Sequence, residues 1–169
     1  IIPQSYSVNL FLRGGVDVVS AMWFNEYHTI LNAGINPDEL ATFFYYDYGL
    51  NFPEDGIYTL NTTFQKDPAL CAAFVRASIE GWRYAFSHSE EALTIVMSNL
   101  EKEHIPATRV HQKWMLERMK DLILPEDGDH AMGTLIEAEY MRVASGLREN
   151  GLIQSIPDFS TFYRKCYDD

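Results

Sequence analysis

The pattern of hydrophobic and polar positions divides the chain into an extended first part and a helical second part. Residues 16–23, "VDVVSAMW", form an apolar run broken only by Asp17 and Ser20. Such a run predicts a strand buried on both faces of a parallel sheet. Two further strands are predicted at "LATFFYY" (40–46) and "IYTLN" (57–61), separated by the turn-rich segment "DYGLNFPEDG".

Helical spacing, caps and glycine stops predict helices in the rest of the chain. The clearest lies in "KDPALCAAFVRASIEGWRYAFSH", where Asp67 can cap the helix, Pro68 suits its first position, and Leu70, Phe74, Ala77 and Trp82 would form its inner face. Ser87 with Glu90 resembles a capping box that opens the next helix. Other predicted helices fall within 5–15, 25–34, 106–123, 134–151 and 158–167. This order of elements predicts an α/β class.

Composition and charge exclude several function classes. The 169 residues carry a formal net charge of −11 with few Lys and Arg, which argues against a nucleic-acid partner. No apolar run is long enough to cross a bilayer, so no membrane insertion is expected of this segment. The two cysteines, Cys71 and Cys166, are predicted to be small buried side chains and give neither a disulfide framework nor a zinc site.

Enzyme motifs are missing from the sequence. There is no Gly-rich phosphate loop, no HExxH, no GxSxG and no paired-cysteine redox motif. The five histidines have no zinc-like spacing and are interpreted as surface or core-edge residues, and the acidic stretch 125–130, "PEDGDH", as a solvated loop. We therefore predict no catalytic residue, no metal and no cofactor.

The residues that follow the first two predicted strands form the candidate ligand site. In open α/β sheets, ligands bind at the carboxyl ends of the strands. Trp23 offers a face for stacking, Asn25 a donor and an acceptor, and Glu26 an acceptor for an amine. The second strand would add Tyr46, Asp47 and Tyr48, completing a clamp for a small, planar, nitrogen-rich ligand. An alternative stays open, in which the aromatics are core residues and Glu26 stabilises a helix N-terminus.

Two long blocks carry a family resemblance. With "GGVDVVSAMWFNEYHTILNAG" and "DYGLNFPEDGIYTLNTTFQKDPALCAAFVRASIEGWRYAFSHSEEAL", the chain resembles the NMT1/THI5-like family of ABC-importer substrate-binding proteins, which are related to the thiamine-pyrimidine synthase of fungi. The resemblance extends from Gly14 to the closing "LIQSIPDFSTFYRKCY". It implies a type II periplasmic-binding-protein fold, in which residues 1–50 end one α/β lobe and 51–169 form the hinge return and helical part of the other. The leading strands would precede Ile1.

The resemblance also implies a function. It predicts an extracytoplasmic solute-binding protein, periplasmic or lipid-anchored, that binds a thiamine-precursor-like aminopyrimidine and delivers it to an ABC permease without making bonds. Glu26 would anchor the pyrimidine edge beside Asn25, with Trp23 and Tyr48 as stacking faces. One alternative is a thiamine-pyrimidine synthase, although the chain lacks that branch's cysteine cluster and a matching histidine. Another is a sulfonate or nitrate binder, against which the carboxylates of Glu26 and Asp47 count.

Overall fold

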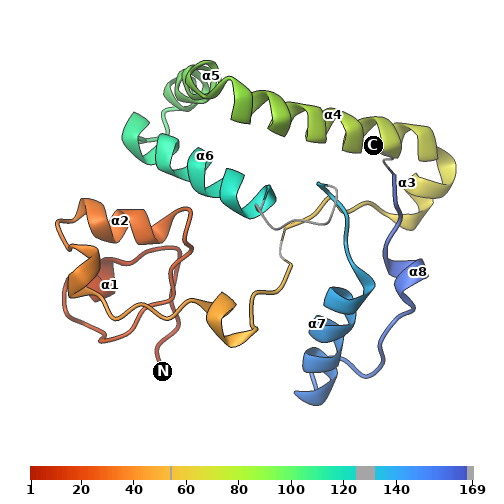
Figure 1. Ribbon diagram of the computed structural model, residues 1–169, viewed down its shortest axis with the longest axis horizontal. Helices are drawn as coiled ribbons and strands as arrows, with labels where there is room; N and C mark the ends of the chain where they lie inside the picture. The colour runs from red at the N-terminus through yellow and green to blue at the C-terminus, as the bar shows by residue number, and fades with distance from the viewer. Residues whose placement is uncertain (54, 125–131, 167–169) are drawn as a thin grey trace. The chain divides into compact units, whose positions relative to one another are not determined.

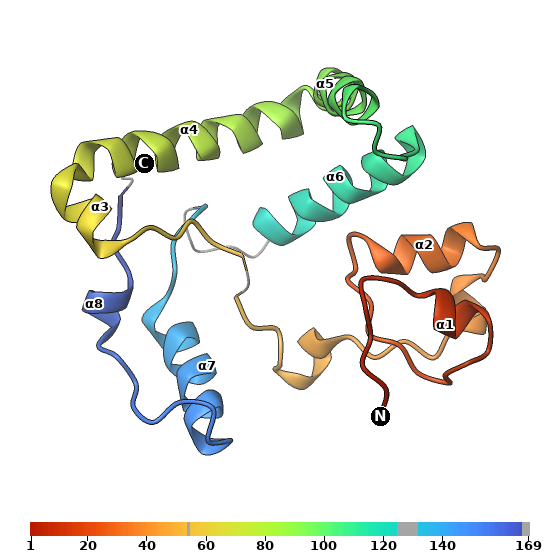
Figure 2. The same ribbon diagram turned by 180° about the vertical axis from the view of Figure 1, so that it is seen from behind.

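The computed structural model describes residues 1–53, 55–124 and 132–166, and the acidic stretch predicted as a solvated loop lies outside them. Its helical elements are shown in Figures 1 and 2. In chain order they are α1 Asn9–Leu12, α2 Glu26–Asn32, η1 Pro37–Glu39, η2 Tyr45–Tyr48, α3 Asn61–Lys66, α4 Pro68–Ser87, α5 Ser89–Lys102, α6 Arg109–Ile123, α7 Glu137–Glu149 and α8 Phe159–Phe162. The chain forms two compact units, one of Ile1–Thr42 with Arg83–Asp127 and one of Phe43–Trp82 with Gly128–Asp169.

The predicted α/β class, and with it the type II periplasmic-binding-protein-like fold, is wrong. The described ranges contain helices and 3-10 turns but no strand. All three segments predicted as strands, 16–23, 40–46 and 57–61, fall within these ranges. A sheet requires extended neighbours whose backbone groups pair, and hydrophobicity alone does not supply them.

In the first predicted strand, backbone N–H and C=O groups find hydrogen-bond partners without a sheet. The Gln4 side-chain amide bonds both backbone groups of Ser20: Oε1 accepts from the Ser20 N–H at 3.0 Å and Nε2 donates to the Ser20 carbonyl at 2.7 Å. One side chain thus takes the place of a neighbouring strand at that residue. The apolar run is not buried either, since Val18 is 83% exposed.

The other two predicted strands are replaced by local turns. Residues Tyr45–Tyr48 wind into η2, which ends at Gly49 in the left-handed region with φ of 68°. The Leu50 N–H returns to the Tyr45 carbonyl at 2.9 Å, so these backbone groups bond within the turn. Leu60 becomes the N-cap of α3, and its carbonyl accepts from the Thr63 and Phe64 N–H groups at 3.0 and 3.1 Å.

The helix predictions fare better because their signals are local. Helix α4 begins at Pro68, and Asp67 Oδ1 accepts from the Leu70 N–H at 2.9 Å, which confirms the predicted cap. The predicted inner face is wrong, since Phe74 is 60% exposed and Ile79 is the buried residue of this helix. The capping box at Ser87 is also wrong: Ser87 ends α4, where its Oγ donates to the Arg83 carbonyl at 2.7 Å, while His88 precedes α5.

In the first unit, α6 packs against both α2 and α5. Among the described residues of this unit, Val8, Ile30 and Leu93 are the buried apolar ones. Thr108 caps α6 by accepting from the His111 N–H at 3.3 Å, which fixes where the helix begins. Because α6 contacts both neighbours, its residues position those of α2.

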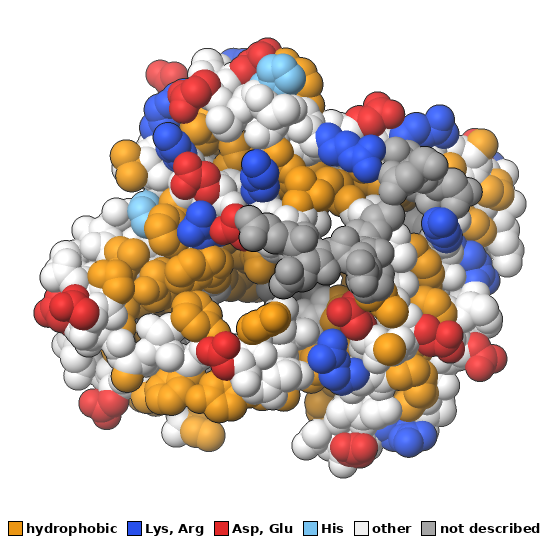
Figure 3. Space-filling view, in the orientation of Figure 1, with side chains coloured by type: hydrophobic (Ala, Val, Ile, Leu, Met, Phe, Trp, Pro, Cys, Tyr) orange, Lys and Arg blue, Asp and Glu red, His pale blue; other side chains and the backbone are white. Residues whose placement is uncertain are grey.

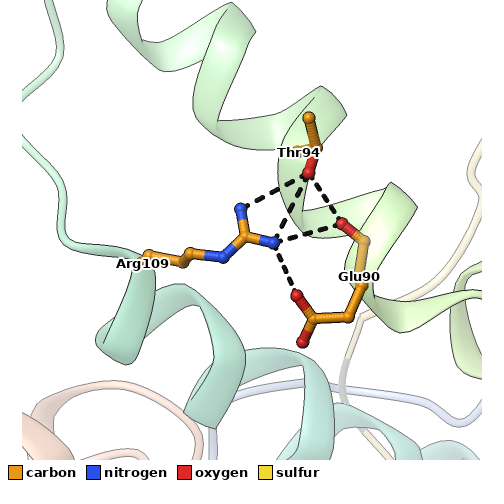
Figure 4. A network of polar contacts seen from close by, with 3 residues as sticks. All are labelled: Glu90, Thr94 and Arg109. Atoms are coloured by element: carbon orange, nitrogen blue, oxygen red, sulfur yellow. Dashed lines mark hydrogen bonds and ion pairs between the residues drawn. The ribbon is translucent and has the colours of Figure 1, made fainter.

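An arginine joins α5 to the start of α6 (Figure 4). Arg109 Nη2 donates to Glu90 Oε2 at 2.7 Å and to the Glu90 carbonyl at 3.3 Å, and both Nη atoms lie 3.4 Å from Thr94 Oγ1. The hydrogen bond and charge of Arg109 lower the pKa of the Glu90 carboxyl. Both side chains are solvent-exposed, so this contact orients the two helices more than it stabilises them.

In the second unit, α7 and α8 lie side by side (Figures 1 and 2). The Tyr140 hydroxyl donates to the Pro157 carbonyl at 2.6 Å, and its ring lies 4.9 Å from that of Phe162 between centroids.

Aromatic residues of 43–60 are exposed, Tyr46 at 74%. Figure 3 shows hydrophobic side chains over much of the face it draws. Within the described ranges, no helix combines the length and hydrophobicity that a membrane crossing needs.

Candidate ligand-binding site

The six predicted site residues fall in the two units. Trp23, Asn25 and Glu26 lie where α2 begins in the first unit. Tyr46, Asp47 and Tyr48 lie on η2 in the second unit, with their side chains exposed. The reason given for the site, the carboxyl ends of parallel strands, does not hold because the described residues form no sheet. The local geometry has to come from the helices instead.

A tight turn places the first three residues. The Met22 carbonyl accepts from the N–H groups of Asn25 and Tyr27 at 3.1 and 3.2 Å, which turns the chain into α2. Glu26 Oε2 accepts from the Met22 N–H at 3.1 Å, so the carboxylate also caps this turn. Glu26 also lies in the first turn of α2, as in the alternative left open, where an acidic side chain stabilises a helix N-terminus. A carboxylate has about four acceptor positions, so the bond leaves room for a ligand amine.

Trp23 belongs to an aromatic cluster that spans α2 and α6. Its ring centroid lies 4.8 Å from that of Tyr27 and 5.5 Å from that of Trp114, which it meets edge to face. Trp114 Nε1 also donates to the Trp23 carbonyl at 3.1 Å. The Trp23 and Tyr27 side chains are partly exposed, so the cluster is packed on one side and open to solvent on the other.

An arginine lies over the same rings. The Arg118 guanidinium carbon is 5.0 Å from the Trp114 centroid and 5.8 Å from that of Trp23, within the range of cation–π contacts. Asp121 Oδ2 lies 3.0 Å from Arg118 Nε, but the pair lacks the alignment of a hydrogen bond. The cluster therefore already holds one planar cation.

A polar chain runs beside the aromatic rings. His111 Nε2 lies 2.9 Å from Asn25 Oδ1, and His111 Nδ1 lies 2.9 Å from His28 Nδ1. Asn32 Nδ2 is 3.0 Å from the same His28 nitrogen. The His28 ring stacks on Trp114 with centroids 4.8 Å apart and is only 7% exposed. Burial, and secondarily the charge of His111, lowers the pKa of His28.

Sequence reasoning missed the contribution of α6. His111, Trp114 and Arg118 recur at helical spacing and so share one face of that helix, a signal that the sequence does contain. The hydrogen-bonding partners of His111 and Trp114, on α2 and in the turn before it, are 83 to 91 residues away, which spacing alone does not reveal. Among the described residues, no group of three or more His, Cys, Asp or Glu side chains is placed to hold a metal ion.

The comparison with known families now bears on this site. The NMT1/THI5-like family model matches residues 2–92, just over half of the chain, and the chain belongs to that family. This confirms the resemblance over the part that contains α2 and η2, while the match ends before α6 begins. No curated protein and no solved structure matches the chain.

Proposed function

We propose that the chain is an extracytoplasmic solute-binding protein that takes up a thiamine-precursor-like aminopyrimidine and passes it, chemically unchanged, to an ABC permease. Family membership supports a small-molecule ligand, and the site's chemistry supports a planar one. The ligand class and permease follow from the family's character and are proposals for this chain. The extracytoplasmic location and the lack of catalysis are proposals as well.

One observation carries the proposal. At the start of α2, partly exposed aromatic rings lie next to polar side chains that can still form hydrogen bonds with a ligand. Trp23 and Tyr27 present partly exposed rings for stacking. Asn25 Oδ1 is engaged by His111, whereas its Nδ2 has no partner among the described residues. Glu26 adds an acceptor next to it in sequence. In an aminopyrimidine, the ring nitrogen accepts a hydrogen bond and the amino group donates one. Asn25 Nδ2 offers the matching donor, and the Glu26 carboxylate offers the matching acceptor.

The same groups make an anion the poorer ligand. Glu26 is a carboxylate, which repels a sulfonate or nitrate. Arg118, the cation that lies over the Trp23 and Trp114 rings, is paired with Asp121. The acidic net charge of −11 adds to this repulsion.

Calorimetric titration tests the proposal. The purified chain is titrated with an aminopyrimidine thiamine precursor, thiamine, taurine and nitrate, and the solution is analysed afterwards for new products. We expect saturable binding of the aminopyrimidine, recovered unchanged, and no binding of the two anions. Binding of taurine or nitrate alone, conversion of the ligand, or no binding of any member of the panel would contradict the proposal.

A further inference from the structure

Arg118 contributes a positive charge to the aromatic cluster. Its guanidinium carbon lies 5.0 Å from the Trp114 ring centroid and 5.8 Å from that of Trp23, so one cation lies over both rings. His28 stacks on Trp114 with centroids 4.8 Å apart, and burial lowers the pKa of its imidazole. Above pH 6.5 the imidazole is therefore neutral and adds no second cation to the Trp114 ring.

The two rings, more than hydrogen bonds, hold the guanidinium in place. Arg118 Nε is buried and has no hydrogen-bond partner among the described residues. Asp121 Oδ2 lies 3.0 Å from this nitrogen without the alignment of a hydrogen bond, and the Asp121 side chain is 55% exposed, so solvent screens the pair. Because a buried N–H without a partner costs free energy, the contact with the rings has to offset that cost.

The guanidinium lies next to the surface on which the proposed ligand would stack. Arg118 follows Trp114 by one helical turn, so both side chains lie on the face of α6 that meets Trp23. The Trp23 ring also contacts Tyr27, with centroids 4.8 Å apart, and both of these side chains are partly exposed. A ring stacked on Trp23 would therefore lie close to the charge of Arg118.

We propose that Arg118 is a specificity-determining residue: it holds the position that a cation would take on the Trp23 and Trp114 rings, so the site accepts neutral planar rings and excludes cationic ones. This inference rests on the proposed function and adds the charge state of the ligand. A second cation would be repelled by Arg118 and would find the attraction of the ring faces already in use. Arg118 lies in α6, outside the part of the chain matched by the family model.

Two carboxylates oppose this exclusion. Glu26 and Asp121 both attract cations, but Glu26 Oε2 already accepts from the Met22 N–H, and Asp121 is exposed to solvent. Arg118 contacts the ring faces themselves, where a cationic ring would have to stack. We therefore expect the repulsion by Arg118 to exceed the attraction of the two carboxylates for a cation stacked on Trp23.

Two probes of matched shape isolate the effect of charge. In mildly alkaline solution 4-methylpyridine is neutral, whereas 1-methylpyridinium, which has the same number of non-hydrogen atoms, is a permanent cation. Calorimetric titration of wild type should show tighter binding of 4-methylpyridine by about 3- to 10-fold. Equal binding of the two probes, or a preference for the cation, would overturn the inference without any variant.

Variants assign this preference to the charge of Arg118. Arg118→Gln should raise the affinity for 1-methylpyridinium relative to 4-methylpyridine by about 3- to 10-fold, whereas Arg118→Lys keeps the charge and should keep most of the preference. Arg142→Gln is the control, because it removes the same charge from an ion pair of the same spacing, with Glu139, in the second unit. It should leave the preference as in wild type.

Asp121 needs a control of its own, because loss of Arg118 leaves its carboxylate without a neighbouring cation. The double variant Arg118→Gln with Asp121→Asn removes both charges, and the relative gain for the cation should persist in it. A gain that disappears in the double variant would overturn the inference. So would an equal gain in Arg142→Gln, or an unchanged preference in Arg118→Gln.

Failure of the proposed function gives a different result. If wild type binds no aminopyrimidine, the proposed function fails, and the relative affinities of the two probes still decide the role of Arg118. If wild type binds neither probe, new binding of 1-methylpyridinium by Arg118→Gln would support that role, and its absence would overturn it. Near-UV circular dichroism verifies in each variant that the aromatic cluster is intact.

Discussion

Trp114 Nε1 donates a hydrogen bond of 3.1 Å to the carbonyl of Trp23, joining residues that are 91 positions apart. The same two rings meet edge to face, with centroids 5.5 Å apart. Trp23 lies in the turn before α2, which contains predicted ligand residues, whereas Trp114 lies in the middle of α6. This contact therefore ties the candidate site to a helix whose sequence lies outside the family match.

Replacing Trp114 with Phe tests this tie. The change keeps a ring but removes the Nε1–H donor and leaves the Trp23 carbonyl without its partner. We expect a loss of about 1–3 kcal/mol in the free energy of unfolding, measured by urea titration with near-UV circular dichroism. Tyr45→Phe, which removes a hydroxyl from an exposed ring in the other unit, is the control and should be close to neutral. Equal effects of the two variants would show that the contact contributes nothing specific.

The helices were predictable because their signals lie close together in the sequence. Asp67, Pro68 and the spacing that follows define α4 within a few residues, and Thr108 starts α6 in the same way. The strands were not, because a strand depends on a partner elsewhere in the chain. In segment 16–23 that partner is the Gln4 side chain, which no periodicity indicates.

The candidate site was predictable in part. Trp23, Asn25 and Glu26 could be selected from residue type alone, but the argument from sheet topology that joined them was wrong. Their observed setting depends on His111, Trp114 and Arg118, and the sequence places these on one face of α6 without indicating what that face contacts. Pairing between distant helices is a property of the folded chain.

Asp67→Ala should weaken the start of α4. The carboxylate accepts from the Leu70 N–H at 2.9 Å, and removing an N-cap acceptor costs about 1 kcal/mol. Thermal unfolding followed by far-UV circular dichroism measures the loss, and Asp67→Ser should restore most of it because a hydroxyl can accept the same bond. A Ser variant as unstable as the Ala variant would exclude capping as the cause.

Acid should loosen the contact between α2 and α6. The pKa of His28 is lowered from its usual 6.5 by burial and by His111, so the unfolded chain binds this proton more readily than the folded one. The contribution of His28 to stability is therefore complete above pH 6.5 and is lost as the pH falls through the lowered value. Tryptophan fluorescence during pH titration should report this change, and His28→Gln should reduce it. Stability that rises as the pH falls below 6.5 would contradict the assignment.

The Arg109–Glu90 contact should respond to both salt and acid. Arg109 lowers the pKa of Glu90, so the pair is intact above the ordinary carboxyl value and is lost as the pH falls through the lowered one. Both groups are exposed, so we expect a small coupling between Arg109→Gln and Glu90→Gln in a double-mutant cycle of melting temperatures at low salt, and none at about 1 M salt. Coupling that persists in high salt would mean that the pair is better shielded than its exposure indicates.

Glu26→Gln separates the two roles of this side chain. The Gln oxygen can still accept from the Met22 N–H, so the turn should persist while the charge is lost. If Glu26 binds the ligand amine, affinity for an aminopyrimidine should fall by about 1.5–3 kcal/mol, as measured by calorimetry. Glu117→Gln, on the exposed side of α6, changes the charge equally and should leave affinity unaltered. Unchanged binding in Glu26→Gln would remove Glu26 from the site.

The most direct measurement of the central claim is a map of where an aminopyrimidine binds. Adding 4-aminopyrimidine to the nitrogen-15-labelled chain should shift the Asn25 side-chain amide and the indole N–H signals of Trp23 and Trp114 together, with one common dissociation constant. That result would place the ligand at the start of α2 against the aromatic cluster. Binding without any change in these three signals would contradict the account.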